Sequence, residues 1–254
     1  MQIRNFILGQ EETYPAFSKV WAFKYTDDII HGINLCLSNM VSRFPFTFFG
    51  IEWKDSERLY LCGEFSLDNE EHRQIQQRII DSKSGYAAKR FVKTPNKNHV
   101  REDFTDFRLQ WMLFCVWQKC LDNADFRHLL MQIPDDVILV ENTTTDNQGS
   151  ADIWGCRNKQ LYECRKQLAD QLTESNPQMK KKHLQQLINI ETNKLDSIGE
   201  WRGQNNIGKI LMTCRDALCV GTSPQIDYKL LDNAKIYLLG KPLTFVWQKT
   251  SKHS

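Results

Sequence analysis

An indole, a cation and a carboxylate follow one another closely at Trp53, Lys54 and Glu57. Aromatic residues with the composition of a strand precede them, and Asp55-Ser56 has the residue types that begin a helix. Glu57 would then lie in a first helical turn, where a glutamate also simply complements the helix dipole. Because a strand end and a helix start can hold all three groups in one cleft, we expect residues 37–65 to form half of an active site, with Glu57 as its catalytic carboxylate.

The second half is expected around Trp154-Gly155. This pair follows a polar, loop-like run over residues 142–153, where a tryptophan is a poor core residue and could stack on a planar ring. Asp152 is the second candidate catalytic acid, although an ordinary loop aspartate fits equally well. Asn205 lies in a glycine-flanked turn and could contact a ribose or a phosphate, or only form the turn.

The first half carries further binding candidates. Lys54, Lys89 and Arg101 could bind a phosphate, although a solvated surface cation is the commoner state of each residue taken alone. Ser38 and Asn39 have the same two interpretations as other turn residues, namely ligand contact or turn formation.

Composition and charge narrow the class of protein. The chain has 254 residues and a net charge of +2, which demands neither a nucleic-acid partner nor a membrane partner. Its eight cysteines include no C-x-x-C pair, and its six histidines show no metal-ligand spacing. No stretch has the apolar length of a membrane span, and the N-terminus is too short for a signal peptide. We expect a reduced, cytoplasmic protein that needs no metal and no cofactor.

Hydrophobic spacing predicts an α-rich α+β fold. Helical periodicity is strongest over residues 101–121, where Phe107, Trp111 and Cys115 recur on an apolar face and predict a central buried helix. Shorter helices are expected over 68–82, 86–92, 124–132 and 210–218, and strands over 20–25, 44–49 and 137–140.

Two additions to this core are expected. Charged amphipathic helices over 158–173 and 178–198 predict an inserted helical hairpin, in which Asn176-Pro177 would cap and begin the second helix. Residues 235–239 and 243–247 predict a C-terminal β-hairpin. The expected organisation is an N-terminal extension over 1–36, one domain over 37–218 with 158–198 inserted, and a C-terminal extension over 219–254.

Six motifs occur in an order that resembles the NADAR superfamily, also called YbiA-like. They are L-S-N-M through W-K-D-S-E at 37–57, A-A-K at 87–89, an R-to-K segment with Met112 and Lys119 at 101–123, L-L through V-E at 129–141, W-G at 154–155, and G-Q-N-N-I-G-K-I-L-M-T-C-R at 203–215. The resemblance covers residues 37–155 and 201–218.

This resemblance implies a single α-rich domain with a small sheet that binds phosphorylated N-ribosyl compounds. Family members hydrolyse the N-glycosidic bond of early riboflavin-pathway intermediates, and others are linked to removing ADP-ribose from modified bases. The expected partner is therefore a small-molecule nucleotide or ribosyl phosphate, or an ADP-ribosylated base in nucleic acid. Glu57 would stabilise the positive charge that develops at C1′ as the bond breaks.

Several positions depart from the family pattern. The family's Gln-Ala-x-Lys is replaced by residues 61–64, which end in Glu64, and its W-G-x-G ends here in Cys156-Arg157. The acid that flanks the family's W-G has no unambiguous counterpart, Asp152 being the closest and Asp146 a second choice.

These departures leave two other hypotheses open. One is a non-catalytic protein that sequesters an NAD-derived, ADP-ribose-like nucleotide, in the setting of virus–host conflict. The other makes residues 156–200 and the C-terminal hairpin an interface for oligomers or partners.

Overall fold

The computed structural model describes residues 4–24, 29–30, 32–146 and 151–245. Its packing divides the chain into two compact units. Unit 1 comprises residues 1–4, 25–133 and 213–254, and unit 2 comprises residues 5–24 and 134–212. Helix α9 (Asn206–Val220) begins in unit 2 and ends in unit 1.

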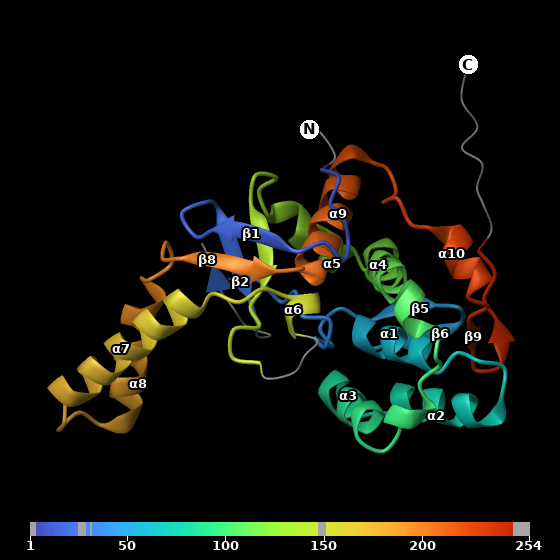
Figure 1. Cartoon of the computed structure of the whole chain (residues 1–254), viewed down its shortest axis with the longest axis horizontal. Helices are drawn as coiled ribbons and strands as arrows, with labels where there is room; N and C mark the ends of the chain where they lie inside the picture. Colours follow the sequence, from blue (N-terminus) through green and yellow to red (C-terminus); the bar gives the residue numbers. More distant parts are fainter. Residues whose placement is uncertain (1–3, 25–28, 31, 147–150, 246–254) are drawn as a thin grey trace. The chain divides into compact units, whose positions relative to one another are not determined.

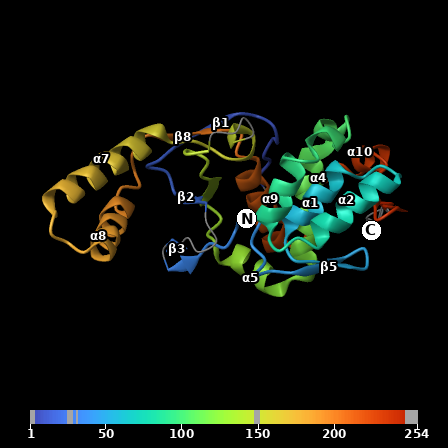
Figure 2. The same ribbon diagram turned by 90° about the horizontal axis from the view of Figure 1, so that it is seen from below.

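Helices dominate unit 1 (Figure 1). They are α1 (Ser56–Glu64), α2 (Glu70–Ile80), α3 (Gly85–Lys93), the 3-10 helix η1 (Lys97–His99), α4 (Phe104–Asp122), α5 (Ala124–Gln132) and α10 (Tyr228–Asn233). Helix α4 packs against α1, α5 and α10, and Figure 2 shows this group from below. Phe107, Trp111 and Met112 on α4 are buried, which confirms the predicted central helix.

Helix α1 begins where the sequence predicts. Asp55 is its N-cap, and the carboxylate accepts a hydrogen bond from the backbone N–H of Arg58 at 3.0 Å. Residues 56–63 are all buried, so nearly the whole circumference of α1 faces protein. The Asp55 side chain also forms an ion pair with Arg58 inside this core.

Short hairpins complete unit 1. Strands β5 (Phe46–Phe48) and β6 (Ile51–Trp53) pair antiparallel around a two-residue turn, in which Phe49 and Gly50 both have positive φ. Strands β3 (Ile29–Ile30) and β4 (Ile33–Asn34) form a second pair.

The predicted C-terminal hairpin is confirmed with a different register. Strands β9 (Tyr237–Leu238) and β10 (Lys241–Pro242) pair antiparallel. The turn is tighter than expected because Leu239 and Gly240 both take positive φ, so the second strand begins at Lys241. Trp247, expected to end it, lies outside the described residues.

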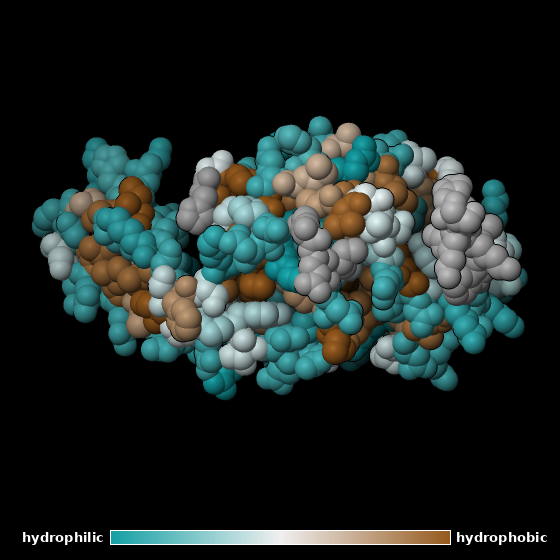
Figure 3. Space-filling model, turned by 90° about the horizontal axis from the view of Figure 1, so that it is seen from above, coloured by the Kyte–Doolittle hydropathy of each residue, from teal (hydrophilic) through white to brown (hydrophobic). Residues whose placement is uncertain are grey.

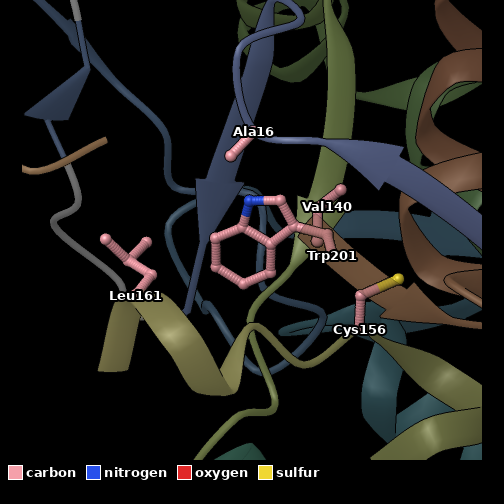
Figure 4. Packing of buried hydrophobic residues seen from close by; sticks show 5 residues of the cluster. All are labelled: Ala16, Val140, Cys156, Leu161 and Trp201. Carbon is pink, nitrogen blue, oxygen red and sulfur yellow. The ribbon is translucent and has the colours of Figure 1, made fainter. Parts of the chain in front are cut away.

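Unit 2 contains two pairs of strands. Strand β1 (Glu12–Pro15) pairs antiparallel with β8 (Glu200–Gly203), and β2 (Val20–Phe23) pairs parallel with β7 (Ile138–Glu141). Trp21 and Phe23 are buried, as the alternation over 20–25 predicts. Figure 4 shows the buried cluster beside these strands: Ala16, Val140, Cys156, Leu161 and Trp201. Residues of the predicted N-terminal extension thus supply two strands of unit 2, while the predicted domain boundaries stay a prediction.

The inserted helical hairpin is present, with one correction. Helices α7 (Lys159–Ser175) and α8 (Lys181–Asn193) pack on each other, and a one-turn helix α6 (Ala151–Trp154) precedes them. The prediction that Asn176 begins the second helix is wrong. A proline disfavours helical backbone at the residue before it, so Asn176 ends α7 and donates its side-chain N–H to the carbonyl of Leu172 at 2.8 Å.

Candidate functional site

Glu57 lies buried at the start of α1. Its side chain is 6% exposed, and Lys89 on α3 places its ammonium nitrogen 3.2 Å from Glu57 Oε1. The backbone N–H of Glu57 donates to the carbonyl oxygen of Asn39 at 3.1 Å. The structure therefore brings together the predicted catalytic carboxylate and one of the predicted cations.

Ser38 and Asn39 hold the start of α1 in place. Lys119, which is fully buried, donates to Ser56 Oγ at 3.2 Å, and Ser56 donates to Asn39 Oδ1 at 3.1 Å. The Asn39 amide donates to the sulfur of Met112 at 3.1 Å. Because its polar groups are engaged by protein and it is 5% exposed, Asn39 acts on the site by positioning Glu57. Ser38 is equally buried, and its hydroxyl oxygen accepts a hydrogen bond from the backbone N–H of Met40 at 3.4 Å.

Burial also changes the pKa of the Lys119 ammonium group. Burial lowers this pKa to about 8, and the nearby Asp55 carboxylate acts in the opposite direction. The Lys119 nitrogen lies 3.8 Å from the centre of the Phe126 ring.

Glu64 is a titratable residue of the site that the sequence analysis did not select. It lies two helical turns after Glu57, at the C-terminal end of α1. Burial raises its pKa to about 7, and the negative charge of Glu57 acts in the same direction, against the cations of Lys89, Lys93 and Arg108. The signal that could have found it is the departure from the family pattern, which has lysine at this position.

The side chains of Trp53 and Arg101 form hydrogen bonds within the protein core. The Trp53 indole is 1% exposed and donates to the carbonyl of Phe48 at 3.1 Å, inside the β5–β6 hairpin. The Arg101 guanidinium donates to Ser66 Oγ at 2.9 Å and lies over the Phe107 ring. The proposal below therefore includes neither residue as a ligand contact.

Lys54 differs from these two residues because it is exposed, one residue before the cap of α1. It stays a candidate phosphate contact.

In unit 2, Gly155 and Asn205 lie at a close approach of backbones. A side-chain carbon at Gly155 would lie 2.3 Å from the carbonyl oxygen of Glu141, so only glycine fits there. Asn205 is fully buried; it accepts from the N–H of Glu141 at 3.2 Å and donates to the carbonyl of Leu139 at 2.8 Å. Asn205 thus ties the start of α9 to strand β7, and its contact with a ribose or a phosphate stays a prediction.

Asp152 and Trp154 are the accessible candidates of unit 2. Trp154 is partly buried at the end of α6, and Asp152 is exposed and paired with Arg157. Asp152 and Arg157 line a cavity of ≈ 550 Å³ whose other walls come from Glu11, Glu200 and residues 158–160 and 202–204. Its volume lies within the range of small-molecule sites, and its walls are largely charged.

The predicted pairing of Glu57 with Trp154 joins the two units. Glu57 belongs to unit 1 and Trp154 to unit 2, so their juxtaposition stays a prediction. Asp146, the second choice for the family's acid, pairs with Lys24 at 2.9 Å in unit 2. Within the described ranges, no group of three or more histidine, cysteine, aspartate or glutamate residues could hold a metal ion.

Comparison with known families gives the decisive observation. The family model described as NADAR domain matches residues 6–219, which is most of the chain. The chain belongs to the NADAR family. The expected resemblance is confirmed, and the match reaches further toward the N-terminus than the motifs do.

A solved structure supports the fold of this NADAR chain. The NMR structure of the E. coli protein YbiA matches 80% of this chain and 87% of its own, with a TM-score of 0.50 and 20% sequence identity. At that identity the likeness shows the fold, and it confirms the α-rich α+β prediction. Among curated proteins, a search finds no significant match. No helix in the described ranges is both long and apolar enough to cross a bilayer.

Proposed function

We propose that this NADAR protein hydrolyses the C1′–N bond of a phosphorylated N-ribosyl or ADP-ribosyl compound. The observation that carries the proposal is the buried carboxylate of Glu57, which Asn39 and Lys89 hold at the start of α1. A fixed carboxylate in such surroundings is typical of an active site, because burying it costs free energy that folding alone does not repay.

The chemistry follows from where charge develops. Breaking the C1′–N bond makes the ribose ring positive, and a preorganised carboxylate stabilises that charge and orients the attacking water. Lys89 pairs with Glu57, and the positive charges of Lys89, Lys93 and Arg108 act on Glu64; such cations are suited to phosphate groups. In the proposal, Lys54 adds a further cation, while Trp154 and Asp152 stay candidates within unit 2 for an aromatic face and a second acid.

The test is product formation from two candidate substrates. The pure protein would be incubated with a ribosylaminopyrimidine phosphate and with ADP-ribosylated guanine, and free base would be measured. Glu57→Gln keeps the side-chain volume but removes the charge, so we expect the rate to fall by about 100-fold to 1,000-fold. The exposed Glu102, changed to Gln, is the matched control and is expected to keep the wild-type rate. Equal rates for Glu57→Gln and wild type would contradict the proposal.

A second function has one observation in its favour. Arg157 forms an ion pair with the carboxylate of Asp152, the proposed second acid. Arg157 also takes the position at which the family has glycine. A site with one acid neutralised would suit binding without turnover, that is, sequestration of an ADP-ribose-like nucleotide. Equilibrium dialysis with ADP-ribosylated guanine would show tight binding and recovery of intact ligand in that case, and free base if hydrolysis occurs.

A further inference from the structure

Two acids lie on the same helix with different surroundings. Glu57 and Glu64 are seven residues apart on α1, which places their backbones about 10 Å apart along the axis and on the same side. Lys89 and Lys93 reach this side from α3, and Arg108 reaches it from α4. Glu57 forms an ion pair with Lys89, whereas within the described part of the chain the Glu64 carboxyl forms neither a hydrogen bond nor an ion pair.

The position of Glu64 is unfavourable for stability. A carboxylate at the C-terminal end of a helix faces the negative end of the helix dipole, and the last turn of α1 carries no basic residue to offset it. The family's lysine would suit this position better. Glu64 is partly exposed, and an acid in an unfavourable position that a structural role does not explain is a candidate for function.

We propose that Glu64 is a catalytic residue whose carboxyl group protonates the leaving nitrogen as the C1′–N bond breaks; this rests on the function proposed above. The bonding pair of the C1′–N bond goes to nitrogen, which takes the Glu64 proton. Water adds its oxygen to C1′ and passes a proton to Glu57. Solvent then returns one proton to Glu64 and takes one from Glu57, so the net reaction consumes one water and releases the free base.

The electrostatics agree with this division of roles. An acid whose pKa lies near 7 is about half protonated at neutral pH and can both hold and give up a proton there. A carboxyl group that donates a proton and a second one that stabilises charge form a common pair in active sites.

The leaving group provides a sharp test. An aminopyrimidine or guanine must gain a proton as it leaves, whereas nicotinamide leaves a ribosyl phosphate as a neutral molecule without one. We expect Glu64→Gln to lower kcat about 100-fold or more on the first kind of substrate and less than about threefold on nicotinamide ribosyl phosphate. Glu102→Gln is the control and is expected to leave both rates unchanged.

The pH profile gives an independent readout. The wild-type kcat on the proton-requiring substrate should fall above pH 7 as Glu64 loses its proton, and Glu64→Gln should lack this limb. Glu64→Asp keeps an acid and should retain the limb at a reduced rate. The other titratable and charged groups that interact electrostatically with Glu64 are Glu57, Tyr60 and Cys62 on α1, Lys89 and Lys93 on α3, and Arg108 on α4.

The outcomes separate this inference from the proposed function. If wild type releases base and Glu64→Gln slows both substrates equally, or slows neither, Glu64 is not the proton donor while the hydrolase proposal stands. If wild type releases no base from any substrate, the hydrolase proposal fails and the role of Glu64 fails with it.

Discussion

Glu57 and Glu64 show how a single helix can give identical side chains different properties. Glu57 lies at the helix start, where the dipole favours negative charge and Lys89 pairs with it. Glu64 lies at the helix end, where burial and the Glu57 charge raise its pKa to about 7. At the residue scale, two residues of one type thus differ only through their surroundings.

Glu64 is expected to make the stability of the protein depend on pH. Its pKa is about 7 in the folded protein against an ordinary value of 4.5, so the folded state binds more protons between these two values. Stability should therefore fall as pH rises from 4.5 to 7, by at most about 3 kcal/mol. Urea unfolding should show Glu64→Gln more stable than wild type at pH 8 and no different near pH 4.5.

Glu102→Gln provides the baseline for that comparison, since Glu102 is exposed. The same difference between Glu64→Gln and wild type at both pH values would mean that Glu64 carries no raised pKa.

At the scale of elements, the contact between α1 and α4 positions the site. Trp111 on α4 lies against Gly63 on α1, and its indole N–H donates to the carbonyl of Tyr60 at 3.1 Å. A side-chain carbon on Gly63 would lie only 2.1 Å from the indole nitrogen. The glycine is thus needed for close approach of the two helices, although it lies within a helix, where alanine is intrinsically better.

Gly63→Ala is expected to destabilise the protein by about 1–3 kcal/mol, because the overpacking outweighs the better helix propensity of alanine. Thermal and urea unfolding of Gly63→Ala, Trp111→Phe and the double variant would form a cycle. The smaller ring should relieve the clash, so the double variant should lose less than the sum of the two losses. Simple additivity would show that the two residues do not press on each other.

At the scale of the whole molecule, only the ends of the α7–α8 hairpin nearest unit 2 anchor it. Leu161 joins the buried cluster of unit 2, and Arg165 donates to the carbonyl of Leu195 at 2.7 Å, so the chain leaves and returns at neighbouring points. Helix α8 itself contains no buried residue. Figure 3 shows apolar surface on the hairpin, at the left of the view. The hairpin is an addition that unit 2 does not need for its own core.

Replacing residues 168–192 with a short glycine-serine linker is therefore expected to leave the fold and the hydrolysis rate within about twofold of wild type, as is usual when a surface segment with close ends is removed. Circular dichroism and the base-release assay would check this. Leu161→Ala, which removes a core side chain at the anchored end of the hairpin, should instead cost about 2–4 kcal/mol.

A folded deletion variant without hydrolysis would place the hairpin in the site. A wild-type sedimentation mass above one chain that falls to one chain after deletion would support the interface hypothesis for residues 156–200.

The local sequence pattern alone predicted several helix boundaries, the central helix and the family of this protein. The cap at Asp55, the start of α1 at Ser56 and the apolar spacing of α4 depend on neighbours in the chain, and motif order indicated the family. Burial and pairing depend on distant elements instead. Only the tertiary structure could show that Trp53 and Arg101 bond within the protein core, that Asn176 ends a helix, and that the surroundings of Glu64 raise its pKa. The physical reason is that a side chain's solvation and charge neighbours are set by residues far away in sequence, which no local window contains.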